Sequence, residues 1–249
     1  MKKLLPGVCL LLSATLALAQ MPGETRQEAM LAIQQGNYTH AAQLLRTWAE
    51  RGDAQAQYYL GVMYSNGDGF AQNNAKARQW WEKAAAQGDA KAQYNLGVIY
   101  YDGQGVAQSY AKAREWYEKA AVQGYTNAQY NLGLMYHNGQ GLAQDYARAR
   151  EWWEKAAAQG HAAAQYNLGV MYRTGRGGVQ DYGKAREWWE KAAAQGYAEA
   201  QYNLGFMYAG GRGVAKDLLK ARKWYEQAAA QTENPEIARR ALQALEKMY

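Results

Sequence analysis

The sequence predicts an all-α protein, an α/α superhelical solenoid of repeated helix pairs. The stretch Ala92-Gln-Tyr-Asn-Leu-Gly-Val-Ile-Tyr100 returns almost unchanged every 36 residues, at Ala128, Ala164 and Ala200, and a varied copy begins at Ala56. A period of about 20–50 residues indicates stacked units rather than a globule with one core. Proline is scarce, with 3 residues in 249, and a hydrophobic content of 49% is enough to bury a continuous core.

The first helix of each unit is predicted to be buried. In the second repeat it spans about residues 92–101, and helical spacing distributes apolar side chains nearly all round it. Leu96 and Ile99 share one side, whereas Tyr94 and Val98 share the other. Gly97 costs this helix about 1 kcal/mol relative to alanine, so we expect a steric use, the close approach of another helix.

The second helix of each unit is predicted to be amphipathic. In the second repeat it spans about residues 110–123, where Trp116 and Tyr117 flank a stripe of alanines. Because each large ring buries roughly 150–250 Å², this aromatic pair is expected to dominate the packing of its repeat.

Turn and cap residues mark the helix ends. A glycine suited to a left-handed conformation follows each second helix, at Gly88, Gly124, Gly160 and Gly196. A Ser or Asp precedes each second helix as an expected N-cap, at Ser109, Asp145, Asp181 and Asp217. Glycines of a Gly-x-Gly sequence join the two helices, and an apolar residue follows them. The fourth repeat has Gly178 at that apolar position, so its loop is expected to seat differently.

Charges are mixed along the second helices. Arg114 and Glu118, like Glu115 and Lys119, have the i,i+4 spacing of weak ion pairs on a solvated face. The net charge is +6 over 249 residues, and Arg and Lys alternate with Glu rather than cluster. A nucleic-acid-binding surface needs clustered basic residues, so no nucleic-acid partner is expected.

Residues 1–19 are predicted to be a secretory signal peptide. Two lysines follow Met1, residues 4–16 are mostly apolar, and Ala17-Leu18-Ala19 is a suitable cleavage sequence. The apolar run is short for a membrane span, so we expect no stable membrane insertion after cleavage. We therefore expect a periplasmic or secreted protein. Cys9, the single cysteine, would be removed with the signal peptide.

The repeats resemble Sel1-like repeats, relatives of the tetratricopeptide repeat. The shared pattern is Ala-x-Tyr-x-Leu-Gly-x-x-Tyr, then Gly-x-Gly-Val, then Ala-x-x-Trp-x-x-Lys-Ala-Ala-x-x-Gly, and residues 128–160 match it almost letter for letter. The resemblance implies a helical superhelix that serves as a scaffold for protein or peptide partners and has no catalytic centre of its own.

Four parts are expected along the chain. After residues 1–19, residues 20–55 form a shortened N-terminal tetratricopeptide-like unit, and residues 56–235 form five 36-residue repeats. Residues 236–249 form a C-terminal capping helix, because Asn234-Pro235 is a helix start signal and Ile237, Ala241 and Leu245 share one apolar face.

The mature sequence offers few groups for catalysis or metal binding. Its only serines are Ser65 and Ser109, both in expected loops, and no cysteine remains. The histidines His40, His137 and His161 lack the spacing of metal ligands and are expected to be structural. We expect no catalytic site, no metal and no cofactor.

The candidate binding residues are a series of asparagines. Asparagine is the main polar group expected on the apolar first helix, and it recurs as Asn95, Asn131, Asn167 and Asn203, with Tyr59 at this place in the first repeat. An inward amide would satisfy a buried backbone group and fix the register. Alternatively, the amides line an inner groove and bind an extended peptide, as resemblance to tetratricopeptide domains implies.

The predicted function is that of a non-catalytic scaffold mediating protein–protein or protein–peptide interaction in the cell envelope. A narrower alternative is a periplasmic immunity protein that neutralises a toxic envelope enzyme, a role of some exported relatives. A penicillin-binding hydrolase, suggested for Cys-rich relatives, is disfavoured because residues 20–249 contain no cysteine.

Overall fold

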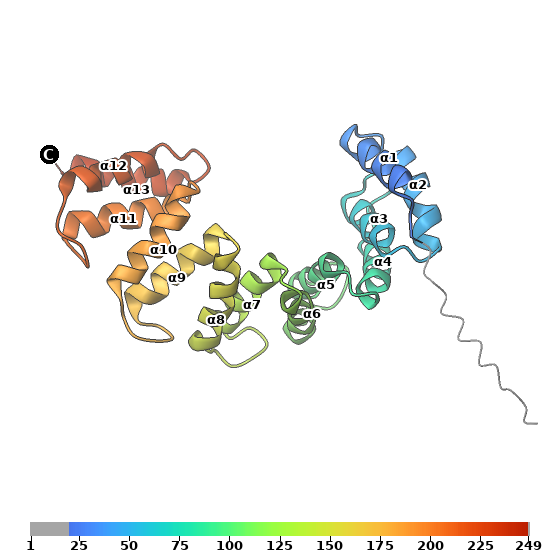
Figure 1. Cartoon of the computed structure of the whole chain (residues 1–249), viewed down its shortest axis with the longest axis horizontal. Helices are drawn as coiled ribbons and strands as arrows, with labels where there is room; N and C mark the ends of the chain where they lie inside the picture. The colour runs from blue at the N-terminus through green and yellow to red at the C-terminus, as the bar shows by residue number, and fades with distance from the viewer. Residues whose placement is uncertain (1–19, 249) are drawn as a thin grey trace, which may run out of the picture. The chain divides into compact units, whose positions relative to one another are not determined.

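The computed structural model describes residues 20–248, so the predicted signal peptide and Cys9 lie outside the described residues. Within them the chain forms 13 α-helices and no strand (Figure 1). The predicted all-α fold of stacked helix pairs is confirmed.

The helices follow one another with short connections. They are α1 (Gly23–Gln34), α2 (Tyr38–Glu50), α3 (Ala54–Asn66), α4 (Asn74–Ala86), α5 (Ala90–Asp102), α6 (Tyr110–Val122), α7 (Thr126–Asn138), α8 (Tyr146–Ala158), α9 (Ala162–Thr174), α10 (Tyr182–Ala194), α11 (Ala198–Gly210), α12 (Leu218–Ala229) and α13 (Pro235–Glu246). Both helices of the second repeat, α5 and α6, lie where the sequence predicts them.

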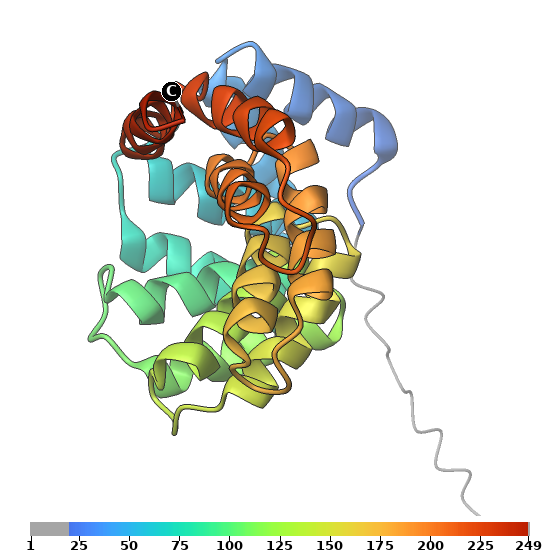
Figure 2. The same ribbon diagram turned by 90° about the vertical axis from the view of Figure 1, so that its left-hand side faces the viewer.

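Two compact units divide the chain between Ala84 and Ala85, inside α4. In the N-terminal unit α2 packs against α1 and α3. In the C-terminal unit each helix from α5 to α12 packs against its neighbours in the chain. The last helix, α13, lies beside α12 in Figure 2 and also contacts α11.

Within each repeat the first helix meets the second through a glycine and an aromatic ring. A Cβ atom added to Gly133 of α7 would overlap the indole of Trp153 in α8. Trp153 is 2% exposed, and its Nε1 donates a hydrogen bond to the Tyr130 carbonyl at 3.1 Å. The contact recurs as Gly61–Trp81, Gly97–Tyr117, Gly169–Trp189 and Gly205–Tyr225. The close approach predicted from the glycine is confirmed.

The first helices are not buried on all sides, so that prediction was wrong. In α7, Leu132 and Met135 are buried at 0% exposure, but Tyr130, Asn131 and Leu134 are only half-buried. The second helix of the same repeat and that of the preceding repeat both pack against α7. Two neighbouring helices cover two sides of a cylinder, and the third side remains open.

The buried polar group of each first helix is a glutamine, not the asparagine. Gln129 is 5% exposed, and its Nε2 donates to the Ala121 carbonyl at the end of α6 at 3.1 Å. Its Oε1 accepts a hydrogen bond of 2.8 Å from Gln159, the C-cap of α8. Gln129 therefore ties α7 to the second helices on both sides. The same bonds recur at Gln93, Gln165 and Gln201.

The predicted caps and turns are confirmed. The side chains of Ser109, Asp145, Asp181 and Asp217 each accept a backbone hydrogen bond at the start of a second helix. The glycines that follow these helices have positive φ, as at Gly124 with 86°. Asn234 caps α13, which begins at Pro235 and buries Ile237 and Ala241.

The fourth-repeat loop differs from the others, as expected. Val106 and Leu142 are half-buried in their loops, whereas Gly178 leaves that place without a side chain. The guanidinium of Arg150 lies there instead. Val179, the next residue, is displaced into solvent and is 85% exposed.

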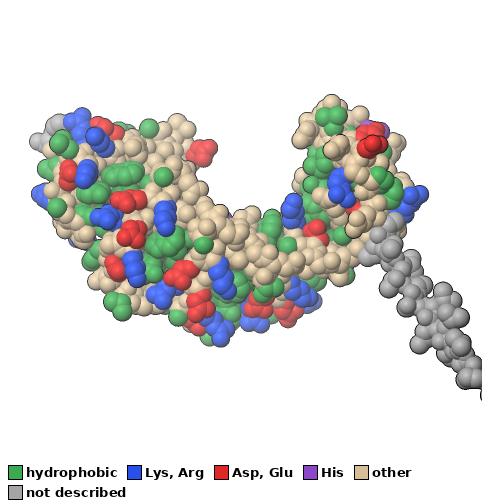
Figure 3. All heavy atoms as spheres, in the orientation of Figure 1, with side chains coloured by type: hydrophobic (Ala, Val, Ile, Leu, Met, Phe, Trp, Pro, Cys, Tyr) green, Lys and Arg blue, Asp and Glu red, His purple; other side chains and the backbone are tan. Residues whose placement is uncertain are grey.

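The charged faces of the second helices form only part of the predicted ion pairs. Arg114 pairs with Glu118 at 3.6 Å, and both signs of charge are interspersed on the face in Figure 3. The Glu115–Lys119 prediction was wrong, because the Lys119 ammonium lies 4.1 Å from the Trp116 ring centroid and forms no ion pair within the described residues. The lysine at i+3 gains a cation–π contact there.

Replacing Gly205 with alanine should destabilise the protein by about 1–3 kcal/mol, because the added methyl collides with the Tyr225 ring. Gly210→Ala in the same helix is the matched control, since Gly210 is exposed and a Cβ there has ordinary contacts only. It should be neutral or stabilise by up to about 1 kcal/mol. Urea unfolding followed by circular dichroism measures both, and equal stabilities of the two variants would contradict the steric interpretation.

Replacing Gln129 with leucine should lower the free energy of unfolding by about 1–3 kcal/mol, because the Ala121 carbonyl and the Gln159 amide both lose a partner. Gln104→Leu, on an exposed loop position, should change it by less than about 0.5 kcal/mol. The same urea titration tests both variants, and a Gln129→Leu protein as stable as the Gln104→Leu protein would show that the buried amide is dispensable.

Candidate functional site

One side of the first helices in the C-terminal unit stays open to solvent, and we call it the open face. On each helix it consists of a tyrosine, the following asparagine and an apolar residue one turn later. These residues are half-buried except Phe206, which is 43% exposed. They are Tyr94, Asn95 and Val98 on α5; Tyr130, Asn131 and Leu134 on α7; Tyr166, Asn167 and Val170 on α9; and Tyr202, Asn203 and Phe206 on α11.

The predicted asparagines lie on this open face, and three of them reach back to the preceding repeat. The Asn131 amide lies near the hydroxyls of Tyr94 and Tyr117 and acts to lower their pKa. Asn167 has the same effect on Tyr130, and Asn203 on Tyr166. An amide has two donors and an acceptor oxygen, so part of its hydrogen-bonding capacity remains for a ligand.

The remaining predicted residues are placed as follows. Asn95 lies half-buried on α5, beside Tyr94 on the open face. Tyr59 lies on α3 in the N-terminal unit, where it packs partly buried against the core of that unit and edge-on to Tyr58 at 5.1 Å.

The hydroxyls of Tyr94, Tyr130 and Tyr166 on the open face stay protonated near neutral pH. Burial raises the pKa of Tyr94, Tyr130 and Tyr166, and the neighbouring asparagine only partly counteracts this rise. Each ring therefore presents a neutral hydroxyl, able to donate and to accept, beside an amide.

A cavity of about 290 Å³ opens on this face between α7 and α9. Leu134 and His137 of α7 line it, together with Asn167 and Val170 of α9 and Arg176 of the following loop. No Asp or Glu of the described chain lines it. Its polar side chains are amides, hydroxyls, an imidazole, an indole and a guanidinium, which can donate to acceptor groups such as carbonyls and carboxylates.

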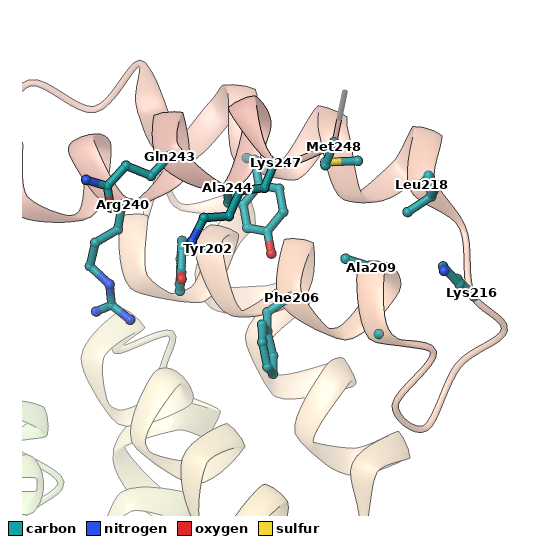
Figure 4. A pocket seen from close by; sticks show the side chains of 12 residues that line it. Tyr202, Phe206, Ala209, Lys216, Leu218, Arg240, Gln243, Ala244, Lys247 and Met248 are labelled. Carbon is teal, nitrogen blue, oxygen red and sulfur yellow. The ribbon is translucent and has the colours of Figure 1, made fainter.

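A larger cavity of about 600 Å³, called here the end pocket, lies where the open face meets α13 (Figure 4). Tyr202 and Phe206 extend the open face into it, and Arg240 of α13 and Lys247, the C-cap of that helix, border it. This pocket was not predicted from the sequence. The available signal was that the last repeat departs from the others at positions that line it, Phe206 among them.

The histidines have structural partners in this structure. His161 caps α9, its Nδ1 accepting from the Ala164 amide at 3.2 Å, and it stacks on Tyr130 at 4.4 Å. His40 pairs with Glu28 at 2.8 Å, and His137 bonds to Asn138 at 2.9 Å. Among residues 20–248 no three or more His, Cys, Asp or Glu side chains are grouped so that they could hold a metal ion.

The boundaries of the matches to a protein-family model coincide closely with these repeats. The Sel1 repeat model matches residues 29–53, 54–89, 90–125, 126–161, 162–197 and 198–233. The chain belongs to the Sel1 repeat family. The first Sel1 match covers α2 and part of α1, and each later match covers one helix pair.

Solved structures with the same fold include other Sel1 repeat proteins. The protective antigen c5321 of uropathogenic Escherichia coli is 37% identical with a TM-score of 0.78, over 83% of this chain and 46% of that one. This Sel1 chain thus spans less than half of c5321. A Sel1 repeat protein from Oxalobacter formigenes is 30% identical with a TM-score of 0.77, over 89% and 96% of the two chains.

A more distant structure shares the fold alone. The immunity protein Pa5087 from Pseudomonas aeruginosa is 19% identical with a TM-score of 0.51, over 85% of this Sel1 chain and 83% of its own. No curated protein sequence matches the chain. Among the helices described for this Sel1 protein, none has both the length and the apolar character needed to cross a membrane.

Replacing His161 with asparagine should reduce the loss of stability at mildly acidic pH. Burial lowers the pKa of His161 below its ordinary value of 6.5, and only the neutral ring can accept from Ala164. As the pH falls below about 6.5, the unfolded chain takes up the proton first, so the stability contributed by this cap is lost. Asparagine caps the helix at any pH.

Thermal unfolding between about pH 7.5 and pH 5 should therefore show a weaker pH dependence for His161→Asn than for the wild type. Tyr197→Asn, at the same cap position of α11, is the matched control and should keep the wild-type dependence. Burial raises the pKa of Tyr197 to about 12, so it does not titrate in this range. Identical slopes for all three proteins would rule out the His161 effect.

Proposed function

We propose that this chain is a non-catalytic scaffold of the cell envelope, and that its open face binds an extended segment of a partner protein. The observation that supports it most directly is the repetition of the same half-exposed tyrosine, asparagine and apolar residue on α5, α7, α9 and α11. The buried positions of each first helix are covered by the neighbouring second helices, whereas these repeated side chains form a surface that a partner can reach.

The chemistry of the open face suits an extended peptide. An extended segment presents unpaired backbone N–H and C=O groups at regular intervals, and an asparagine amide can donate to one and accept from the other. Tyrosine supplies large amphipathic contact area, which is why it is enriched at the centres of interfaces. The apolar residue one turn along the helix can contact a side chain of the peptide that lies between two of its hydrogen-bonded backbone groups.

The envelope location rests on the N-terminal sequence alone. Residues 1–19 have the composition of a secretory signal peptide, and the remaining chain contains no cysteine that would need an oxidising or a reducing compartment. The narrower alternative, an immunity protein for a toxic envelope enzyme, shares its fold with Pa5087, but 19% identity supports the fold and not the role.

Replacing Asn131, Asn167 and Asn203 together with alanine tests the proposal. Each lost amide contact weakens binding by about 0.5–1.5 kcal/mol, so recovery of envelope proteins that the wild type captures should fall roughly tenfold or more. Quantitative mass spectrometry of the captured proteins measures this. Asn127→Ala, an exposed position on α7 outside the open face, should leave capture unchanged.

The unfolding midpoint of the triple variant separates the two interpretations of the asparagines. If capture falls while the midpoint stays within a few degrees of the wild type, the amides act on the partner. Unchanged capture by a folded triple variant would exclude the open-face asparagines as binding residues.

A further inference from the structure

The last full repeat departs from the others at several positions that line one cavity. Phe206 stands where the other repeats have Val or Leu, and Leu218 stands where Tyr110, Tyr146 and Tyr182 stand. Lys216 stands where the other repeats have glutamine. All three side chains line the end pocket, which holds about 600 Å³ (Figure 4).

Lys216 replaces a residue with a structural use. In each earlier repeat the glutamine donates to a carbonyl near the end of the first helix and holds the loop against it, as Gln144 does to the His137 carbonyl at 2.7 Å. The equivalent bonds of Gln72, Gln108 and Gln180 are 2.7–2.8 Å long. Lys216 forms no such bond within the described residues. The last repeat therefore gives up a loop contact and gains an exposed ammonium at the pocket.

Cations border both ends of the end pocket. Arg240 of α13 and Lys247, its C-cap, lie at one end, while Lys216 lies at the other, beyond Phe206 and Ala209 (Figure 4). None of these three cations forms an ion pair with the part of the chain that the structure describes, and no Asp or Glu lines the pocket. Arg212 adds a fourth positive charge close by, 5.0 Å from the Phe206 ring centroid.

The space between these cations is apolar and open. Phe206 is 43% exposed and Leu218 is 48% exposed, so both present apolar surface to solvent. Arg240 lies 4.6 Å from the Tyr202 ring centroid, so the Tyr202 ring is held at the cationic end. Burial raises the pKa of Tyr225, also in the lining, to about 12, and its hydroxyl remains a donor.

We propose that the end pocket anchors a partner segment in which one large apolar side chain is flanked on both sides by carboxylates. The apolar side chain lies against Phe206 and Leu218, and the flanking carboxylates lie at Arg240 and Lys247 on one side and at Lys216 on the other. Charge complementarity and the exposed apolar surface between the charges determine this choice of partner. This inference rests on the proposed function, because it specifies the partner chemistry at one end of the open face.

Fluorescence anisotropy with a synthetic probe tests it on the full mature chain. The probe is a short fluorescein-labelled peptide with a central phenylalanine flanked on both sides by glutamates. One control peptide has serine in place of the phenylalanine, and another has lysines in place of the glutamates. The variants Phe206→Val and Lys216→Gln introduce the residues that α9 and its loop carry as Val170 and Gln180, so folding should be preserved.

We expect the probe to bind the wild type, more weakly as salt is added, and neither control peptide to bind measurably. Lys216→Gln and Arg240→Gln should each weaken binding about threefold to tenfold. Arg239→Gln is the matched control, since Arg239 is exposed on α13 next to Arg240 but does not line the pocket. It should leave binding unchanged.

Three results would overturn the proposal. They are equal binding by wild type and all variants, equal binding of the lysine peptide, and concentration-dependent self-association through the pocket that excludes the probe. If the probe fails while capture of envelope proteins still depends on Asn131, Asn167 and Asn203, only the end-pocket inference is lost. If capture is independent of these asparagines but the probe binds as expected, the open face is lost as a binding surface and the pocket remains.

Discussion

The contact between a bare glycine and an aromatic ring is the constraint on which the rest of this repeat depends. At Gly133 the Trp153 ring lies in the space that any other side chain would fill, and the ring is held there by its bond to the Tyr130 carbonyl. The separation of the two helices in a repeat is therefore set by the thickness of a ring. Where tyrosine replaces tryptophan, as at Tyr117, the ring keeps its place over Gly97 without an indole N–H. The steric contact, rather than the hydrogen bond, is thus the shared element.

The stacking of each repeat on the next depends on a second contact, which is made by the buried glutamine. Gln129 is the one polar side chain of α7 that is almost fully buried, and both ends of its amide are used, towards α6 and towards the end of α8. A bond network of this kind specifies one register, because a shifted helix would leave a buried amide unpaired. Since these two neighbours cover α7 on two sides, its third side must face solvent. The open face is therefore a consequence of the way α6 and α8 pack against α7 and bury Gln129.

Much of the fold could be predicted from the sequence because its determinants are local. Helix limits, the Asp145 cap and the turn at Gly124 depend on neighbours in the chain, and all were predicted. The side on which α7 is open depends on how α6 and α8 pack against it, which the pattern within one helix does not show. The lysine contact over Trp116 was missed because charge spacing considers only the oppositely charged partner. The asparagines of the candidate site lie on an accessible helix side, and the end pocket requires the docked α13, which no repeat pattern contains.

Residues that depart from the repeat pattern fall into two kinds. Some keep or replace the structural contact of the usual residue, and others lose it. His161 replaces tyrosine or aspartate, yet it still caps its helix and stacks on Tyr130, so its presence is explained by structure. Gly178 gives up an apolar side chain, and Arg150 fills the space. Lys216 has no such compensation, because the loop bond made by Gln180 in the preceding repeat is lost and nothing in the described chain replaces it. A position that gives up a structural contact and exposes a charge beside an apolar cavity is explained better by a partner than by the fold.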